Sequence, residues 1–196
     1  MKLVCVILGY LFGSLSASIL LSRCVFHADI RTQGSGNAGA ANAARVFGMG
    51  AGILTFVCDF AKTVLAMLLG RLLCGETGLV LAGFGCLVGH CWPLYFRFRG
   101  GKAVSSGAAA ALMLDWRLFL LAVAVYALGA VCSKKASVSS LCGAFAIGVG
   151  SFWLLNEPQK KALAVFITLL VFFMHRSNIR RLIDGTEPKF SFGKRN

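Results

Sequence analysis

The sequence predicts an all-α integral membrane protein with about seven transmembrane helices. Of its 196 residues, 58% are hydrophobic and 14% are charged, whereas soluble domains average roughly 45–50% and about 25%. The mean hydropathy is +0.78. Several uncharged runs approach the length of about 20 residues that crosses a bilayer as a helix. The same composition excludes an intrinsically disordered chain, because disorder requires low hydrophobicity.

Seven apolar runs are the candidate spans. The first is longer than the roughly 7–15-residue apolar region of a signal peptide, so we interpret it as a span. Two runs are short, and we expect these helices to be tilted or half-buried. We expect residues 1–196 to form a single polytopic domain in the lipid bilayer. The runs cover residues 3–22, 49–69, 77–96, 103–114, 118–132, 138–155 and 162–174.

The positive charges predict the orientation. If the N-terminus is outside and the spans alternate, 14 of the 20 Lys and Arg residues fall in cytoplasmic segments, and Lys62 lies within a span. The positive-inside rule therefore favours an outer N-terminus and a cytoplasmic C-terminus. The outer segments hold only Lys2, Arg71, Arg117, Lys160 and Lys161.

The 8 cysteines carry no signal of a metal site. They lie mostly in the apolar runs, with no Cys-x-x-Cys pair and no Cys/His cluster of zinc-ligand spacing. We interpret them as small hydrophobic residues of membrane helices, and we expect neither a metal nor a cofactor.

The first inner loop carries a glycine-rich motif, Gly-Ser-Gly-Asn-Ala-Gly-Ala-Ala-Asn-Ala-Ala-Arg, over residues 34–45. Glycines let backbone N–H groups approach an anion closely, and an arginine offers a planar fork for phosphate. The surroundings fit neither a Walker loop nor a dinucleotide fingerprint, and a plain flexible loop would explain the glycines alone. The candidate anion-binding residues are Ser35, Gly36, Asn37, Gly39, Asn42 and Arg45.

The second inner loop, residues 89–106, interleaves aromatic residues with arginines. An interfacial belt with snorkelling arginines accounts for most of it. It does not account for Gly100-Gly101-Lys102 at the mouth of a helix, which we interpret as a second anion site. His90 is either a helix-packing residue or a site residue.

The third motif follows the last span. His175 and Asn178 have the i, i+3 spacing of one helical face and could grip a polar substrate, although a solvated tail would also explain the arginines around them. Within a span, Asp59 and Lys62 can neutralise each other. Ser139 is a further candidate phosphate donor.

Together these motifs resemble the bacterial acyl-phosphate:glycerol-3-phosphate acyltransferase family. The matching blocks are residues 35–45, 89–93 with 98–106, and 175–187, together with Asp59, Lys62 and Val138-Ser139. The resemblance covers nearly the whole chain. The chain departs from the family pattern at Ala41, which stands for a threonine, and at residues 103–106, where Gly-Val-Ala-Thr reads Ala-Val-Ser-Ser. We expect these departures to affect substrate affinity more than activity.

The resemblance implies transfer of an acyl chain from acyl phosphate to the sn-1 hydroxyl of glycerol 3-phosphate, on the cytoplasmic face of a bacterial inner membrane. Catalytic roles then fall to Arg45, Lys102, His175 and Asn178. Substrate binding falls to residues of the three motifs and to Ser139. We expect no nucleic-acid partner, and the sequence identifies no protein partner. The substrate-binding set is Ser35, Gly36, Asn37, Gly39, Asn42, His90, Gly100, Gly101, Ser139 and Glu187.

Other interpretations stay open at this point. A small anion transporter would also place charged residues in a cavity, and a structural membrane subunit would use the loops to bind lipid head groups. The His-x-x-x-x-Asp motif of CoA-dependent glycerolipid acyltransferases is absent, as is a Gly-x-Ser-x-Gly nucleophile elbow. His90, His175 and a substrate phosphate are all candidate acceptors of the hydroxyl proton.

Overall fold

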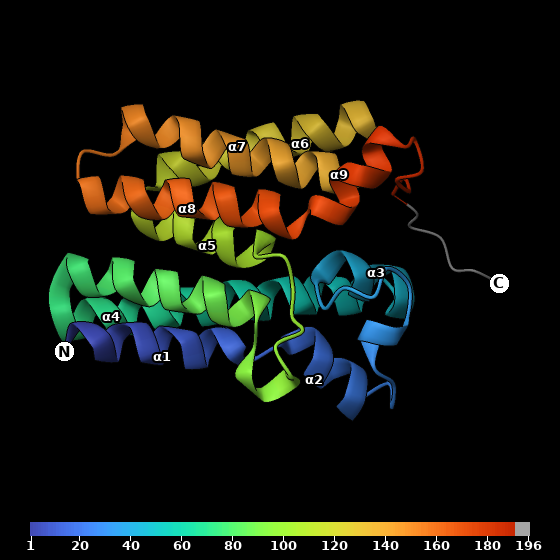
Figure 1. Ribbon diagram of the computed structural model, residues 1–196, viewed down its shortest axis with the longest axis horizontal. Helices are drawn as coiled ribbons and strands as arrows, with labels where there is room; N and C mark the ends of the chain where they lie inside the picture. Colours follow the sequence, from blue (N-terminus) through green and yellow to red (C-terminus); the bar gives the residue numbers. More distant parts are fainter. Residues whose placement is uncertain (191–196) are drawn as a thin grey trace. The chain divides into compact units, whose positions relative to one another are not determined.

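A computed structural model describes residues 1–190, and in this range every regular element is a helix (Figure 1). The chain forms two compact units, residues 1–106 and residues 107–190. The all-α prediction is confirmed, whereas the single domain stays a prediction. The first unit holds α1 (Lys2–Ser14), α2 (Ala17–Cys24), α3 (Ala40–Phe47) and α4 (Met49–Cys91); α5 (Val104–Leu114) contains the boundary; the second unit holds α6 (Trp116–Ser133), α7 (Ala136–Leu154), α8 (Pro158–Met174) and α9 (Arg176–Ile183).

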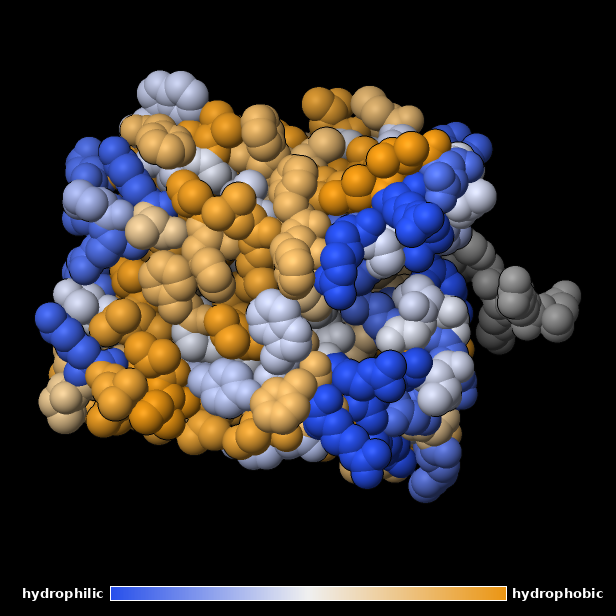
Figure 2. Space-filling view, viewed as in Figure 1, coloured by the Kyte–Doolittle hydropathy of each residue, from blue (hydrophilic) through white to orange (hydrophobic). Residues whose placement is uncertain are grey.

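The helices expose apolar side chains as a membrane protein does. Leu72, Val131 and Trp153 are each at least three-quarters exposed. In each unit, hydrophobic residues cover the visible flanks of the helices and hydrophilic residues gather near the helix ends (Figure 2). Among the described residues, four helical stretches are long and apolar enough to cross a bilayer, or five if the bent α8–α9 pair is one span. Seven spans and the orientation of the termini stay predictions.

The long helix α4 is a hairpin of two legs. Its backbone leaves helical geometry at Cys74 and at Gly75, which has a φ of +60°. This break lies within the connection expected between the apolar runs 49–69 and 77–96. Past the break the legs lie side by side (Figure 1). They pack so closely that a Cβ atom on Gly78 would clash with the backbone of Gly70. The backbones of the two legs are therefore in direct contact at these glycines.

Glycines also bring α1 against the second leg of α4. A Cβ atom on Gly85 would lie 2.8 Å from the backbone nitrogen of Tyr10, and one on Gly89 would lie 2.9 Å from that of Ser14. Small residues spaced four apart allow this close approach between membrane helices.

The second unit is a bundle of α6, α7 and α8 followed by the short α9. Thr168 Oγ1 on α8 donates to the carbonyl of Ala144 on α7 at 2.6 Å, and a Cβ atom on Gly129 of α6 would lie 3.1 Å from the Cα of Ser139 on α7. Between α8 and α9 the chain bends by 58° at His175. The bend places the third motif at one end of this bundle.

Candidate active site

The glycine-rich motif is half loop and half helix. Gly34 and Gly36 adopt φ values of +58° and +71°, which favour glycine, and Gly39 is the N-cap of α3. Ser35 is exposed in this loop, and Asn37 is half-buried. The loop therefore leads into a helix N-terminus, a favourable location for an anion.

Asn42 on α3 holds the loop in place. Its side-chain oxygen accepts a hydrogen bond from the backbone N–H of Ser35 at 2.9 Å. Its amide nitrogen donates to the carbonyls of Ile30 and Gln33 at 3.3 and 3.0 Å. Because both amide hydrogens bind backbone, Asn42 acts through the loop. Arg45, one turn further along α3, is exposed and approaches the Asn42 oxygen at 3.5 Å.

An ion pair ties the first loop to the second. Asp29 receives two hydrogen bonds from the Arg31 guanidinium, at 2.7 and 2.9 Å, and Arg31 also donates to the carbonyl of Phe96 at 2.7 Å. The hydrogen bonds from Arg31 hold the pKa of the Asp29 carboxyl well below its usual range, against the opposing effect of burial. The pair is therefore fully charged at neutral pH.

The second loop folds back onto the end of α4. The backbone N–H groups of Gly100 and Gly101 donate to the carbonyls of Cys91 and His90, at 3.1 and 3.0 Å. A Cβ atom on Gly101 would lie 2.8 Å from His90 Cε1, closer still to Nε2, and 3.1 Å from the carbonyl oxygen of Ala38. The first and second motifs therefore meet at Gly101, where only glycine fits.

Lys102 follows at the mouth of α5 and is half-buried. The next residue, Ala103, is buried with a φ of +59°. Left-handed backbone is unfavourable for any residue with a Cβ atom. The alanine that replaces the family glycine is thus strained at this position.

A buried cluster of three ionisable side chains lies beneath this loop. Lys62 Nζ is 2.7 Å from Asp59 Oδ1 and 3.2 Å from His90 Nδ1, and it donates to the carbonyl of Leu15 at 2.6 Å. The expected Asp59–Lys62 pair is present. An ammonium group only donates, so His90 Nδ1 is the acceptor and Nε2 carries the ring hydrogen. Sequence reasoning missed the contact between this pair and His90, which no spacing rule reveals.

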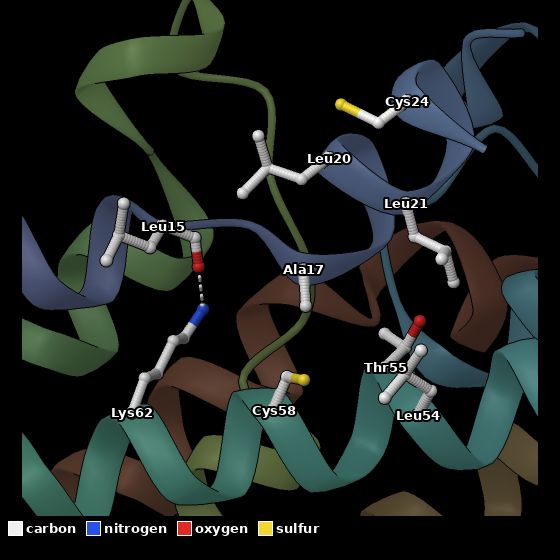
Figure 3. A pocket seen from close by; sticks show the side chains of 9 residues that line it. All are labelled: Leu15, Ala17, Leu20, Leu21, Cys24, Leu54, Thr55, Cys58 and Lys62. Atoms are coloured by element: carbon white, nitrogen blue, oxygen red, sulfur yellow. Dashed lines mark hydrogen bonds between the residues drawn. The ribbon is translucent and has the colours of Figure 1, made fainter. Parts of the chain in front are cut away.

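The same lysine lines an apolar groove of about 420 Å³ between α2 and the first leg of α4 (Figure 3). This volume is in the range of about 300–1,000 Å³ that is typical of small-molecule sites. The sequence did not predict the groove. Its lining residues are Leu15, Ala17, Leu20, Leu21, Cys24, Leu54, Thr55, Cys58 and Lys62.

In the second unit, His175 is buried at the bend between α8 and α9. Its Nδ1 lies 2.8 Å from the carbonyl oxygen of Val171. A carbonyl oxygen accepts but does not donate, so Nδ1 carries the hydrogen and the lone pair of the neutral ring is on Nε2. His175 is therefore the histidine with proton-accepting chemistry at Nε2, whereas His90 is a donor there.

Asn178 and Glu187 form a buried pair next to it. Asn178 Nδ2 donates to Glu187 Oε1 at 2.7 Å, and Arg181 Nε donates to Oε2 at 2.8 Å. Burial raises the pKa of Glu187, but the bonds from Asn178 and Arg181 and the nearby Ser137 hydroxyl outweigh it, so the net pKa shift is downward. Within residues 1–190 the Ser137 hydroxyl is buried and forms no well-aligned hydrogen bond. Glu187 is thus ionised and orients Asn178.

Ser139 lies near the start of α7 and is fully buried. Its hydroxyl donates to the carbonyl of Lys135 at 3.0 Å, one turn earlier. In this geometry the hydroxyl hydrogen is engaged by a backbone carbonyl of the preceding turn. A phosphate-donor role for Ser139 stays a prediction.

The predicted site residues thus form two groups. In the first unit, the two glycine loops converge with His90, Gly100 and Gly101 at their junction. In the second unit, Asn178 and Glu187 are in direct contact, and His175 lies three residues before Asn178. The two groups carry the donors and positive charges that phosphates require.

Comparisons with known proteins give a consistent match. Residues 3–185 match the profile of the family described as glycerol-3-phosphate acyltransferase. A relative from Thermoanaerobacter pseudethanolicus with that description is 37% identical over 185 residues, covering 93% of this chain and 92% of the relative. One from Clostridioides difficile is 36% identical over 195 residues, covering 95% and 94%.

Two solved structures share the fold. Crystal structures of PlsY (YgiH), described as an integral membrane glycerol 3-phosphate acyltransferase, were obtained in a glycerol 3-phosphate form and a lysophosphatidic acid form. The first superimposes with a TM-score of 0.92 at 28% identity, covering 97% of this chain and 96% of that one. The second gives 0.88 at 27% identity with the same coverage.

Proposed function

The chain belongs to the glycerol-3-phosphate acyltransferase family, and we propose that it transfers an acyl chain from acyl phosphate to the sn-1 hydroxyl of glycerol 3-phosphate. The products are lysophosphatidic acid and inorganic phosphate. The observation that supports this most is the meeting of two glycine loops at Gly101, with Arg45 on one and Lys102 on the other. Two cations beside a glycine-rich loop that leads into a helix N-terminus suit a reaction in which both substrates are phosphorylated.

Acyl phosphate needs little chemical activation. It is a mixed anhydride, so its carbonyl carbon is electrophilic and phosphate is a good leaving group. Catalysis then consists mainly of positioning and of stabilising charge. Arg45 and Lys102 hold phosphates and offset the charge that develops on the leaving group. Ser35, Asn37 and the N–H group of Gly39 cradle one phosphate, whereas the Gly36 N–H shapes the loop by donating to the carbonyl of Gln33 at 2.9 Å.

The C-terminal motif serves the acceptor. Asn178, oriented by Glu187, positions glycerol 3-phosphate. The hydroxyl proton passes to His175 Nε2 or to an oxygen of a substrate phosphate. His90 does not accept it, because its Nε2 already carries a hydrogen when Lys62 donates to Nδ1.

The apolar groove beside Lys62 receives the acyl chain. Its walls are apolar apart from Thr55 and Lys62, and they belong to helices with lipid-exposed flanks. A Cys58→Trp variant, which fills the groove, should raise the KM for palmitoyl phosphate more than that for a short-chain acyl phosphate. Cys132 on α6 is also exposed but does not line the groove, so Cys132→Trp is the matched control.

The donor is tested with purified protein in detergent. Palmitoyl phosphate and glycerol 3-phosphate together should release inorganic phosphate, and neither alone should do so. NMR of the lysophosphatidic acid should place the acyl group at sn-1. Robust transfer from palmitoyl-CoA would show that the proposed donor is wrong.

The charge distribution supports an active site on the cytoplasmic face of a bacterial inner membrane. A reporter that is active only in the cytoplasm, fused to the C-terminus, should give a signal. The same reporter at the N-terminus should give none.

A further inference from the structure

Three ionisable side chains are buried together in α4, within a stretch apolar enough to cross a membrane. Asp59, Lys62 and His90 are 1%, 8% and 5% exposed. Ionisable groups in such segments are expensive and usually mark function. Stability alone does not explain the Asp59–Lys62 pair, because apolar residues of similar volume often replace buried ion pairs without loss.

We propose that Asp59 and Lys62 are positioning residues of the acyltransferase, which act through His90 on the Gly100–Lys102 loop. The pair holds the His90 ring in one orientation and one tautomer, with Nε2–H directed at Gly101. The ring in turn sets the position of the loop that carries Lys102. The effect of this positioning on catalysis rests on the acyltransferase function proposed above.

Three groups hold the ammonium of Lys62 in place. Its ammonium has three hydrogens, and three acceptors surround it: Asp59 Oδ1, His90 Nδ1 and the Leu15 carbonyl. The contact with Asp59 is short, but its angle is that of an ion pair and not of a good hydrogen bond. Asp59 Oδ1 also lies 3.7 Å from His90 Nδ1. The lysine is thus held from three directions and cannot move without releasing His90.

The break between α1 and α2 supplies one of those acceptors. Leu15 has extended backbone geometry after the end of α1. Its carbonyl points at Lys62 along the hydrogen bond drawn in Figure 3. The helix break leaves this carbonyl without a helical partner, and Lys62 supplies the missing donor. This arrangement fixes the Lys62 head group relative to α1 as well as α4.

The Gly100–Lys102 loop packs directly against His90. Gly101 N–H donates to the His90 carbonyl at 3.0 Å, and the space above its Cα is filled by the imidazole ring. The loop therefore contacts both the backbone and the ring of one residue. A rotation of the ring would move Gly101 and its neighbour Lys102.

A paired apolar substitution separates positioning from stability. The double variant D59L/K62M removes both charges at similar volume and so leaves no unpaired buried charge. It also removes the donor to the Leu15 carbonyl, so its thermal unfolding temperature in detergent should fall about as much as that of the Thr63→Val control below. If the pair positions His90, kcat/KM should fall at least about tenfold in the double variant, the equivalent of one lost buried hydrogen bond, and should not fall in the control. Protection of the protein against thermal unfolding by inorganic phosphate should also be lost.

A second pair of variants tests the Nε2–H group directly. Gln at position 90 can place an amide N–H near the position of Nε2, whereas Asn reaches only the position of Nδ1. His90→Gln should therefore retain more kcat/KM and more phosphate protection than His90→Asn. A purely structural role predicts the opposite order or no difference, because Asn keeps the contact to Lys62.

Thr63→Val is the matched control. Thr63 is buried on the same helix. Its hydroxyl donates to the backbone carbonyl of Asp59 and accepts from Cys86 Sγ, so its bonds do not involve the three ionisable side chains. It should lower the unfolding temperature and leave kcat/KM unchanged. Wild-type kcat/KM and phosphate protection in D59L/K62M would overturn the positioning role. An inactive wild type with palmitoyl phosphate would overturn only the proposed function, since phosphate protection still tests the cluster.

Discussion

A single methyl group at Gly101 should disable the enzyme. In the Gly101→Ala variant the new Cβ would lie 2.8 Å from His90 Cε1, whereas ordinary contact begins at 3.4 Å. The ring cannot yield easily, because Lys62 holds its Nδ1 at 3.2 Å, and on the other side the Ala38 carbonyl is 3.1 Å from the new atom. The loop must therefore move by more than half an ångström.

The consequence can be measured as a rate. A misplacement of about 1 Å in an active site can cost about 100-fold, so we expect a loss of roughly 10- to 100-fold in phosphate release from palmitoyl phosphate. Gly50→Ala is the matched control, because nothing lies within 4 Å of a Cβ atom there, and it should keep full activity. A Gly101→Ala enzyme within about threefold of the wild type would refute the close contact of the two loops.

Three further changes have defined outcomes. Arg45→Ala and Lys102→Ala should each lower turnover by at least about 100-fold while the protein stays folded; wild-type rates in both would remove their proposed roles. Glu187→Gln should lower the free energy of unfolding at neutral pH by about 2 kcal/mol. Because the folded-state pKa of Glu187 is lowered, the wild type should lose stability as the pH falls below about 4.3 and this carboxylate becomes protonated. The variant has no carboxyl at this position, so its stability should fall less over the same pH range. Ala103→Gly, which relieves a φ of +59°, should raise stability by about 0.5–1 kcal/mol, and an unchanged or lower unfolding temperature would argue against strain there.

Hydropathy and spacing were sufficient for much of the fold. The helical runs after residue 100 are each present within a few residues of their expected bounds, because long uncharged segments have one stable solution in a bilayer. The break inside the first run was not predicted. At the helix interruption the Leu15 carbonyl accepts a hydrogen bond from Lys62, 47 residues later, and sequence periodicity contains no information on such distant partners.

The sequence pattern indicated two anion-binding loops, but not the contacts that each of their side chains makes. Glycines, an arginine and a lysine in two loops indicated anion binding, and both loops do converge. Asn42 was expected to contact a phosphate, yet its amide hydrogens bind the loop backbone. The chemical type of a side chain shows that it can donate. Which acceptor it meets depends on backbone turns that follow from tertiary packing.

The packing of α1 against α4 also determines the geometry of the second loop. Glycines let the backbones of the two helices come into direct contact. The end of α1 therefore reaches the start of this loop. There Ser14 Oγ accepts a hydrogen bond from the backbone N–H of Leu94 at 3.1 Å, and Tyr10 donates to the carbonyl of Trp92 at 3.0 Å. A larger residue at Gly89 would push α1 outward and pull these bonds apart, along with the Leu15 carbonyl that Lys62 needs. The small residues of these helices therefore support the geometry of the second loop as well as the packing of the helices.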